Sequence, residues 1–286
     1  MKMPPFDYAC PATLPEAIAL LSAHGGDAKV LAGGQSLLPV LRMRLAAPTK
    51  LIDLGRIPEL RGVREDDGNL VIGAMTTHYA VESSPVVKSK CPVLAATAGQ
   101  IGDPMVRNMG TIGGSLAHAD PAADYPAAII ALGAEMVAEG PKGKRTIKID
   151  DFFKGLLTTA LADDEILTEI RVPAAATNEK SAYMKFPHPA SRFAVVGVAA
   201  VLSMDGGKIG KASIGITGAG TKATRAKGVE AAIAGKAADA ASIQAAAEKA
   251  ADGVDVQADL QGSVEYKQHL LRVFAKRAME AAAAKK

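Results

Sequence analysis

The stretch Thr111-Ile112-Gly113-Gly114-Ser115 repeats a pattern that already occurs at Ala32-Gly33-Gly34-Gln35-Ser36, some eighty residues earlier in the chain. A glycine pair allows positive φ angles and lets a ligand approach bare backbone N–H groups, and the serine hydroxyl adds a further donor. Each turn is therefore expected to hold a phosphate. Two such turns fit a ligand whose two phosphates are held from both sides, such as a dinucleotide, better than a single nucleotide.

The composition is that of a globular protein of 286 residues, with 49% hydrophobic and 22% charged residues. A chain of this length can bury a core without disulfides, as two domains or one large α+β unit. The net charge of +3 is small and dispersed, so a nucleic-acid partner is not expected. The two cysteines, Cys10 and Cys91, cannot build a four-cysteine zinc or iron–sulfur site, and no metal site is expected.

The ends and apolar runs of the sequence bear on its location. Residues 1–7 hold no apolar segment of the kind found in secretory signals, so a cytoplasmic location is expected. The longest apolar run, residues 193–202, is far shorter than the roughly 20 residues that span a bilayer, and no membrane span is expected.

The first 56 residues predict a helix followed by a strand, a glycine turn, a second helix and a second strand. Thr13-Leu14-Pro15-Glu16 has the form of a capping box, and the helix that follows is expected to end at Gly25. Strands over 29–31 and 50–54 flank a helix that opens at Leu37. The first glycine turn is thus placed at a helix N-terminus, where anions commonly bind.

Alternating strand and helix patterns continue to the end of the chain. Strands are expected over 70–74, 135–137, 146–149, 165–172, 183–186, 194–204 and 208–217, the last two joined by a hairpin at Asp205-Gly206-Gly207. Helices are expected over 93–101, 122–132, 222–234, 238–251 and 263–284. A boundary at 173–178 completes three predicted pieces, residues 1–56, 57–176 and 177–286.

Other motifs have simpler structural or binding interpretations than the catalytic or nucleotide-binding motifs that they resemble. The segment 218–223 fits a relaxed dinucleotide fingerprint, but helices follow it where a second parallel strand is needed, so a strand-to-helix turn is favoured. Ser36 lacks the closing glycine of a nucleophile elbow and is interpreted as a phosphate ligand. The residues alone leave Asp124 open between a helix-favouring charge and a ligand for hydroxyl groups, and they favour an exposed Lys185. The five histidines show no metal spacing and are interpreted as surface or structural residues.

Four stretches resemble the FAD-binding subunit of molybdenum-containing hydroxylases, with the medium subunit of aerobic carbon monoxide dehydrogenase as the closest type. They are residues 31–39, 101–104, 107–115 and 120–124. The resemblance runs over nearly the whole chain. It implies an α+β fold, in which a two-lobed FAD-binding domain of the p-cresol methylhydroxylase/vanillyl-alcohol oxidase type precedes a C-terminal α/β domain with a small antiparallel sheet covered by helices.

The resemblance also implies a set of cofactor-binding residues. Two segments would hold the FAD pyrophosphate and neighbouring atoms: Leu31, Ala32, Gly33, Gly34, Gln35, Ser36 and Leu37, and Thr111, Ile112, Gly113, Gly114 and Ser115. Ile101 would pack against the cofactor, Asp124 would bind on the polar side of the flavin, and Leu161 and Lys185 would lie at the flavin. Phe193 stands in a stretch where the carbon monoxide enzymes tend to carry Tyr near the flavin.

The function implied is that of an FAD-carrying electron-transfer subunit in a heterotrimeric molybdenum hydroxylase. A large molybdopterin subunit would oxidise the substrate, and a small subunit with two [2Fe–2S] clusters would pass electrons to the flavin, in a dimer of heterotrimers. Quinone, NAD or oxygen would be the acceptor, and no catalytic acid–base residue is expected in this chain. A self-sufficient FAD oxidase of the same flavin-domain superfamily and a flavin-free interaction subunit are the alternatives.

Overall fold

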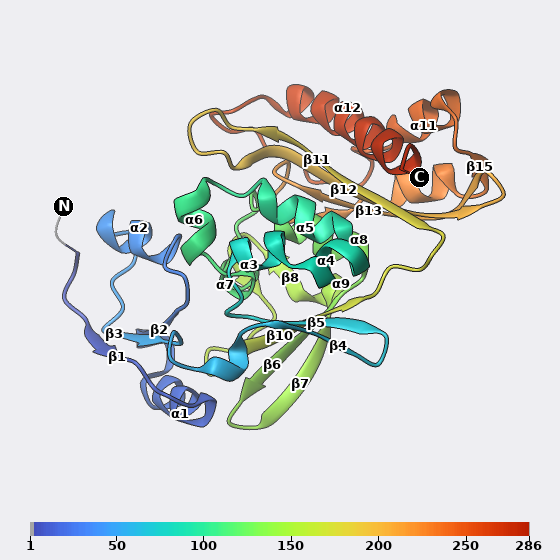
Figure 1. Ribbon diagram of the computed structural model, residues 1–286. Helices are drawn as coiled ribbons and strands as arrows, with labels where there is room; N and C mark the ends of the chain where they lie inside the picture. The colour runs from blue at the N-terminus through green and yellow to red at the C-terminus, as the bar shows by residue number, and fades with distance from the viewer. Residues whose placement is uncertain (1–2, 286) are drawn as a thin grey trace.

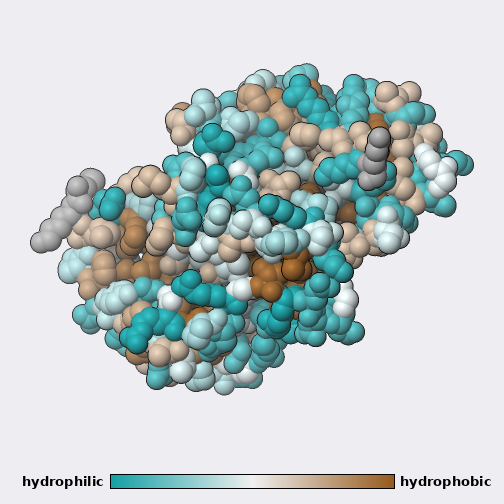
Figure 2. All heavy atoms as spheres, in the orientation of Figure 1, coloured by the Kyte–Doolittle hydropathy of each residue, from teal (hydrophilic) through white to brown (hydrophobic). Residues whose placement is uncertain are grey.

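The computed structural model describes residues 3–285, which form three main sheets with helices packed between and over them (Figure 1). The face of the molecule shown in Figure 2 is largely polar. Among the described residues, every helix is too short or too polar to cross a membrane.

The N-terminal lobe is a three-stranded parallel sheet with two helices. Its elements are β1 (Asp7–Ala9), α1 (Leu14–His24), β2 (Ala28–Leu31), α2 (Leu37–Arg42) and β3 (Lys50–Asp53), and the strand order is β1-β3-β2. The Thr13 side chain caps α1 by accepting a hydrogen bond from the Glu16 N–H, and α1 ends before Gly25, whose φ is 52°. Because β2 and β3 are parallel, the first glycine turn lies between β2 and α2, and the predicted strand–turn–helix–strand opening is confirmed.

The central part is an antiparallel sheet with a layer of short helices on one face (Figure 1). In sheet order, its strands are β4 (Val63–Asp66), β5 (Asn69–Gly73), β10 (Ile166–Pro173), β6 (Glu135–Gly140) and β7 (Gly143–Lys148). The helices are α3 (His78–Ser83), α4 (Pro85–Lys90), α5 (Pro92–Gly99), α6 (Pro104–Met109), α7 (Ile112–His118) and α8 (Tyr125–Leu132). Proline fits the first turn of a helix but cannot continue a preceding one, so prolines at the starts of α4, α5 and α6 divide this region into short helices.

The C-terminal part is a second antiparallel sheet, covered on its outer face by helices. It contains β11 (Glu179–Pro187), β12 (Ala194–Asp205), β13 (Lys208–Thr217), β14 (Thr224–Arg225) and β15 (Lys236–Ala237), with α10 (Lys227–Ile233), α11 (Ala240–Ala247) and α12 (Val264–Ala283). The predicted hairpin between β12 and β13 is confirmed, with φ of 53° at Gly206 and 83° at Gly207. Such paired positive φ angles suit a two-residue hairpin turn.

The inner face of this sheet rests on α8. A Cβ at Gly215 in β13 would lie 2.0 Å from the Ala127 carbonyl oxygen, so helix and strand backbones touch. Between α8 and β10, the chain forms α9 (Ile149–Phe152) and the short strands β8 (Phe153–Gly155) and β9 (Thr158–Thr159); the 3-10 helices Gly25–Asp27 and Pro58–Leu60 lie in the N-terminal third.

Several predicted helix bounds are wrong. The helix predicted over 222–234 begins only at Lys227, because Thr224–Arg225 pair with β13 as a strand. The helix predicted over 238–251 is confined to α11. The helices α3, α4, α6 and α7 were not predicted. The chain passes between sheets at residues 53–63 and 173–179. The domain bounds at 56 and 176 stay predictions.

The helix predicted over 122–132 begins only at Tyr125. The reason lies in the C-terminal sheet, which takes up the backbone just before it. The Gly218 N–H donates to the Pro121 carbonyl (2.7 Å), and the Ala194 N–H donates to the Ala122 carbonyl (3.0 Å). Residues 121–124 are thereby held as an irregular segment between the two sheets.

Candidate cofactor-binding site

A cavity of about 630 Å³ lies between the N-terminal lobe, the central helices and the loops before β10 and β12. This volume is in the range of small-molecule sites. Most of the residues singled out from the sequence line it: Ala32, Gly33, Gly34, Gln35, Ser36, Leu37, Ile101, Thr111, Gly113, Gly114, Ser115, Asp124 and Leu161. Leu31, Ile112 and Lys185 lie behind this wall rather than in it.

The first glycine turn presents free backbone donors to the cavity. Among the described residues, no protein acceptor is found for the backbone N–H groups of residues 33–37. Gly34 has a φ of 72°, a left-handed conformation that glycine adopts readily. Consecutive N–H groups of this kind form a concave anion site. The turn therefore has the geometry expected of a phosphate-binding segment.

The second glycine segment does not present such donors, which corrects the expectation of two equivalent turns. The Gly113 N–H donates to the Ala74 carbonyl (2.9 Å), and the Gly114 N–H donates to the Thr111 hydroxyl (3.1 Å). Both glycines belong to α7, and neither has a positive φ. A Cβ at Gly113 would lie 2.4 Å from the Ala74 Cβ, so this glycine serves close packing against the end of β5.

The two glycine segments touch each other through their backbones. A Cβ at Gly33 would lie 2.2 Å from the Met109 carbonyl oxygen and 2.6 Å from the Gly110 Cα. Gly33 also lacks a positive φ. Its missing side chain is therefore required by the approach of residues 109–110.

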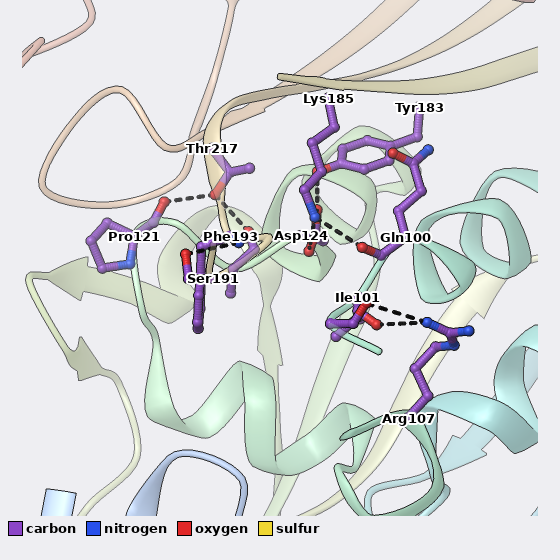
Figure 3. Close-up of polar contacts among 12 residues, drawn as sticks. Gln100, Ile101, Arg107, Pro121, Asp124, Tyr183, Lys185, Ser191, Phe193 and Thr217 are labelled. Atoms are coloured by element: carbon purple, nitrogen blue, oxygen red, sulfur yellow. Dashed lines mark hydrogen bonds and ion pairs between the residues drawn. The ribbon is translucent and has the colours of Figure 1, made fainter. Parts of the chain in front are cut away.

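A buried ion pair lies at the cavity wall, where α8 meets β11 (Figure 3). The Lys185 Nζ lies 2.9 Å from Asp124 Oδ1 and 3.0 Å from Oδ2, and it also donates to the Gln100 carbonyl (2.9 Å). The Tyr183 hydroxyl donates to Asp124 Oδ1 (2.6 Å). The exposed Lys185 expected from residue type is wrong, since its side chain is 2% exposed. Asp124 is likewise more than a helix-favouring charge.

The charges around Asp124 act in opposite directions. Burial raises the pKa of the Asp124 carboxyl, while Lys185, the Tyr183 hydroxyl and Arg192 oppose that shift. Burial and the neighbouring Asp124 raise the pKa of Tyr183 well above its usual value, so its hydroxyl stays a donor. The Lys185 ammonium and the Tyr183 hydroxyl thus hold the Asp124 carboxylate from behind, and Asp124 lines the cavity.

The C-terminal sheet fixes this carboxylate through the backbone that precedes it. The Thr217 hydroxyl at the end of β13 lies 2.7 Å from both the Pro121 and the Ala123 carbonyl oxygens (Figure 3). Thr217 is 2% exposed. Together with the bonds from Ala194 and Gly218, the hydroxyl makes the C-terminal sheet a structural part of the cavity wall.

Two further segments shape the mouth of the cavity. Arg107 holds the turn at Ile101 by donating to the Ile101 carbonyl (3.1 Å) (Figure 3). The Arg107 Nε also donates to Glu82 (2.9 Å). Phe193 lines the cavity from the loop before β12 and is 41% exposed. The preceding Arg192 has a φ of 61°, an uncommon left-handed conformation for a residue with a side chain.

His78, at the start of α3, lines the cavity and was not singled out from the sequence. It is 4% exposed, and burial together with the charge of Arg107 lowers its pKa to about 4. The imidazole is therefore neutral at physiological pH. No motif surrounds this residue, and only the fold brings it to the cavity.

The comparisons with known proteins agree over the whole chain. The family described as the FAD binding domain in molybdopterin dehydrogenase matches residues 4–175, and the CO dehydrogenase flavoprotein C-terminal domain matches residues 181–282. The chain belongs to the FAD-binding medium subunits of molybdenum hydroxylases. It is thus a flavoprotein subunit of an oxidoreductase complex, with FAD as its cofactor, and the expected α+β fold class is confirmed.

Individual medium subunits are similar from end to end. The carbon monoxide dehydrogenase medium chain of Hydrogenophaga pseudoflava is 44% identical, covering 99% of this chain and 98% of that protein. The nicotine 6-hydroxylase medium subunit of Paenarthrobacter nicotinovorans is 37% identical, with both chains covered completely. A solved structure of carbon monoxide dehydrogenase from Hydrogenophaga pseudoflava superposes with a TM-score of 0.97 at 45% identity, covering 99% of each chain.

The cavity of this medium subunit suits FAD in three respects. Residues 33–37 offer free N–H groups to a phosphate, the backbone contact at Gly33 leaves no room for a side chain, and the carboxyl residue Asp124 lines the same space. The N–H groups of residues 33–37 and the carboxyl group of Asp124 lie at separate places in the cavity. Such an arrangement matches a ligand that has a diphosphate linker and polar ring systems.

Proposed function

We propose that this chain carries FAD as the electron-transfer subunit of a heterotrimeric molybdenum hydroxylase. Electrons from [2Fe–2S] clusters of a small partner subunit would reach the flavin and leave to quinone, NAD or oxygen, while a large molybdopterin subunit oxidises the substrate. The observation that carries the proposal is the cavity, into which the first glycine turn presents backbone N–H groups that have no protein acceptor among the described residues. Similarity to medium subunits over nearly the full length supports it.

Each part of the cavity wall has a proposed role in holding the cofactor. The free N–H groups of residues 33–37 would bind the diphosphate, with Thr111 and Ser115 bordering the same space. Ile101 and Leu161 would pack against the ring system. Asp124 would accept hydrogen bonds from its polar edge, with Lys185 supporting the carboxylate from behind. Leu31 and Ile112 would act by packing beneath the two glycine segments.

The bound flavin would supply the redox chemistry, and the protein orients it and sets its electrostatic surroundings. The buried pair of Asp124 and Lys185 places a fixed dipole at the cavity wall. Phe193 lines the cavity and would restrict the access of water to the flavin. The chain itself therefore needs no nucleophile or general base.

Purified protein tests this proposal directly. Flavin absorbance at about one FAD per chain, with negligible turnover of alcohols or aldehydes by the chain alone, is the expected result. A colourless chain that fails to take up added FAD would contradict the cofactor role. Rapid oxidation of such substrates by the isolated chain would favour a self-sufficient oxidase instead.

Co-expression with its partners tests the assembly. We expect the chain to co-purify with a molybdopterin subunit and an iron–sulfur subunit, at a mass corresponding to a dimer of heterotrimers. Substrate added to that complex should bleach the flavin absorbance. Bleaching that persists after the iron–sulfur subunit is removed would contradict the proposed route of the electrons.

A further inference from the structure

His78 is a buried polar side chain at the cavity wall with no partner for its inner nitrogen. Its Nδ1 is fully enclosed and makes no hydrogen bond within the described part of the chain. Leaving a buried polar atom unpaired is costly, so such an atom needs an explanation. The ring belongs to a residue that is 4% exposed and that lines the cavity.

The backbone fixes the imidazole beside the second glycine segment. The His78 N–H donates to the Gly110 carbonyl (2.9 Å), and Thr77 forms a β-bridge with Thr111. A Cβ at Gly110 would lie 2.5 Å from His78 Nε2, so Nε2 rests against the bare backbone of Gly110. The Gly110 Cα is also the atom on which Gly33 packs. Nε2 therefore lies next to the contact of the two glycine segments, close to the free N–H groups of the first.

The ring packs against a second buried side chain whose polar group is unpaired among the described residues. Tyr125, the first residue of α8, is fully buried, and its hydroxyl also lacks a partner among the described residues. The two rings are in contact, with centroids 5.3 Å apart at an angle of 56°. A tyrosine hydroxyl can donate to an imidazole nitrogen, directly after a small ring movement or through one enclosed water. Burial and the neighbouring carboxylates raise the pKa of Tyr125 well above its usual value, so it keeps its proton.

A neutral imidazole has one donor and one acceptor nitrogen. Once Nδ1 accepts from Tyr125, the proton of the ring is on Nε2, at the side of the cavity. We propose that His78 is a cofactor-contacting residue whose Nε2–H donates to an oxygen of the dinucleotide's diphosphate, with Tyr125 as the positioning residue that sets its tautomer. This inference rests on the proposed placement of FAD in the cavity.

Two substitutions separate the ring nitrogens. In His78→Gln the side-chain amide can reach the place of Nε2, whereas in His78→Asn it reaches only the place of Nδ1. We expect His78→Asn to weaken FAD binding by about tenfold, the usual scale for one lost hydrogen bond to a charged group, and His78→Gln to stay within about threefold of wild type. FAD affinity is measured with the full-length chain by flavin fluorescence, and His269→Gln at an exposed position serves as the control.

Competing ligands locate the contact. ADP, which has a diphosphate, should lose competition strength in His78→Asn in step with FAD, while adenosine should compete as it does with wild type. Equal weakening of both competitors, or Asn outperforming Gln, would overturn the proposal. Thermal melting of His78→Asn and His78→Gln measures how much of each variant is folded. A loss of FAD affinity that parallels a loss of folded protein also contradicts the proposal. Failure of wild type to bind FAD would instead contradict the proposed function itself.

Tyr125→Phe tests the positioning role. We expect a smaller loss of FAD affinity, about threefold, together with an imidazole ¹⁵N spectrum in which the Nε2–H tautomer no longer dominates. A purely structural Tyr125 would change the melting temperature and leave the tautomer of His78 unchanged, which would overturn its assigned role.

Discussion

Asp124 and Lys185 lie 61 positions apart in the sequence, yet their charged groups are 2.9 Å apart and their side chains are 4% and 2% exposed. The pair joins the start of α8 to β11 and so connects the central helices with the C-terminal sheet. Water cannot solvate either charge, so each depends on the other. Asp124 forms part of the wall of the cavity proposed to hold the flavin, and Lys185 lies behind it.

Breaking this pair from one side should destabilise the protein strongly. Lys185→Met leaves the Asp124 carboxylate buried without its cation, and we expect the free energy of unfolding to fall by about 3–5 kcal/mol. The double variant Asp124→Asn/Lys185→Met should be more stable than the sum of the two single changes indicates. Urea unfolding measures both. Lys276→Met, which breaks an exposed pair with Glu280, is the control and should cost less than about 1 kcal/mol. If the losses in unfolding free energy of the two single variants add up to that of the double variant, the two residues of the buried pair are not coupled.

Gly33 should tolerate no side chain. In Gly33→Ala the new Cβ would lie 2.2 Å from the Met109 carbonyl oxygen, so the two glycine segments must separate. We expect stability to fall by about 1–3 kcal/mol and FAD affinity to fall at least tenfold. Gly26→Ala is a matched control, because nothing lies within 4 Å of its added Cβ. Thermal melting and flavin fluorescence measure the two effects, and equal behaviour of both variants would contradict the close-contact explanation.

Thr217→Val tests the part that the C-terminal sheet plays in the cavity wall. The change keeps the shape but removes the hydroxyl that lies 2.7 Å from the Pro121 and Ala123 carbonyl oxygens. We expect a loss of about 1–3 kcal/mol in stability, since a buried acceptor is left unpaired, and weaker FAD binding. Thr49→Val, which removes an exposed hydroxyl, should have little effect on either measurement. Undiminished FAD affinity in Thr217→Val would mean that residues 121–124 keep their place without the hydroxyl.

Local patterns in the sequence account for α1, β2, α2 and β3 of the first lobe and for the hairpin of β12 and β13, whereas β1 was not predicted. The Thr13 cap, the glycine turn after β2 and the Gly206-Gly207 turn all depend on neighbours in the chain, and these were predicted. The family resemblance gave the fold class and the cofactor. These features need no knowledge of distant contacts.

The features that were missed arise from long-range contacts. The N–H groups of Gly113 and Gly114 look free in sequence, but Ala74 and the Thr111 hydroxyl occupy them in the fold. Nothing near Lys185 indicates that α8 will bring Asp124 to it. His78 becomes notable only because its ring is enclosed without a partner.

His78 should make the protein less stable in acid. Its pKa is lowered to about 4 in the folded protein, compared with about 6.5 for an unperturbed histidine, because of burial and Arg107. The unfolded chain therefore binds a proton more readily, and stability is lost as the pH falls from about 6.5 to 4, by up to about 3 kcal/mol. Urea unfolding across this range should show a shallower slope for His78→Gln than for wild type. His269→Gln should keep the wild-type slope, and an unchanged slope in His78→Gln would exclude His78 as the source.

The buried pair should also control the flavin reduction potential, with opposite signs for its two members. Reduction adds negative charge to the flavin, so Lys185→Met, which leaves the Asp124 charge unbalanced, should lower the potential, and Asp124→Asn should raise it. One charge at about 4 Å and an effective dielectric near 20 corresponds to at most about 4 kcal/mol, or roughly 90 mV for a two-electron couple, and solvent reduces this to tens of millivolts. Protonation of Asp124 in Lys185→Met would reduce the first shift, so the shift should grow as the pH of the titration is raised. Redox titration of the flavin-loaded variants at two pH values measures these shifts, with Lys276→Met as the control.

The reduction potential of the double variant should lie close to that of wild type, because the pair that it removes is neutral. Shifts of the same sign in both single variants would show that the pair acts through structure rather than charge.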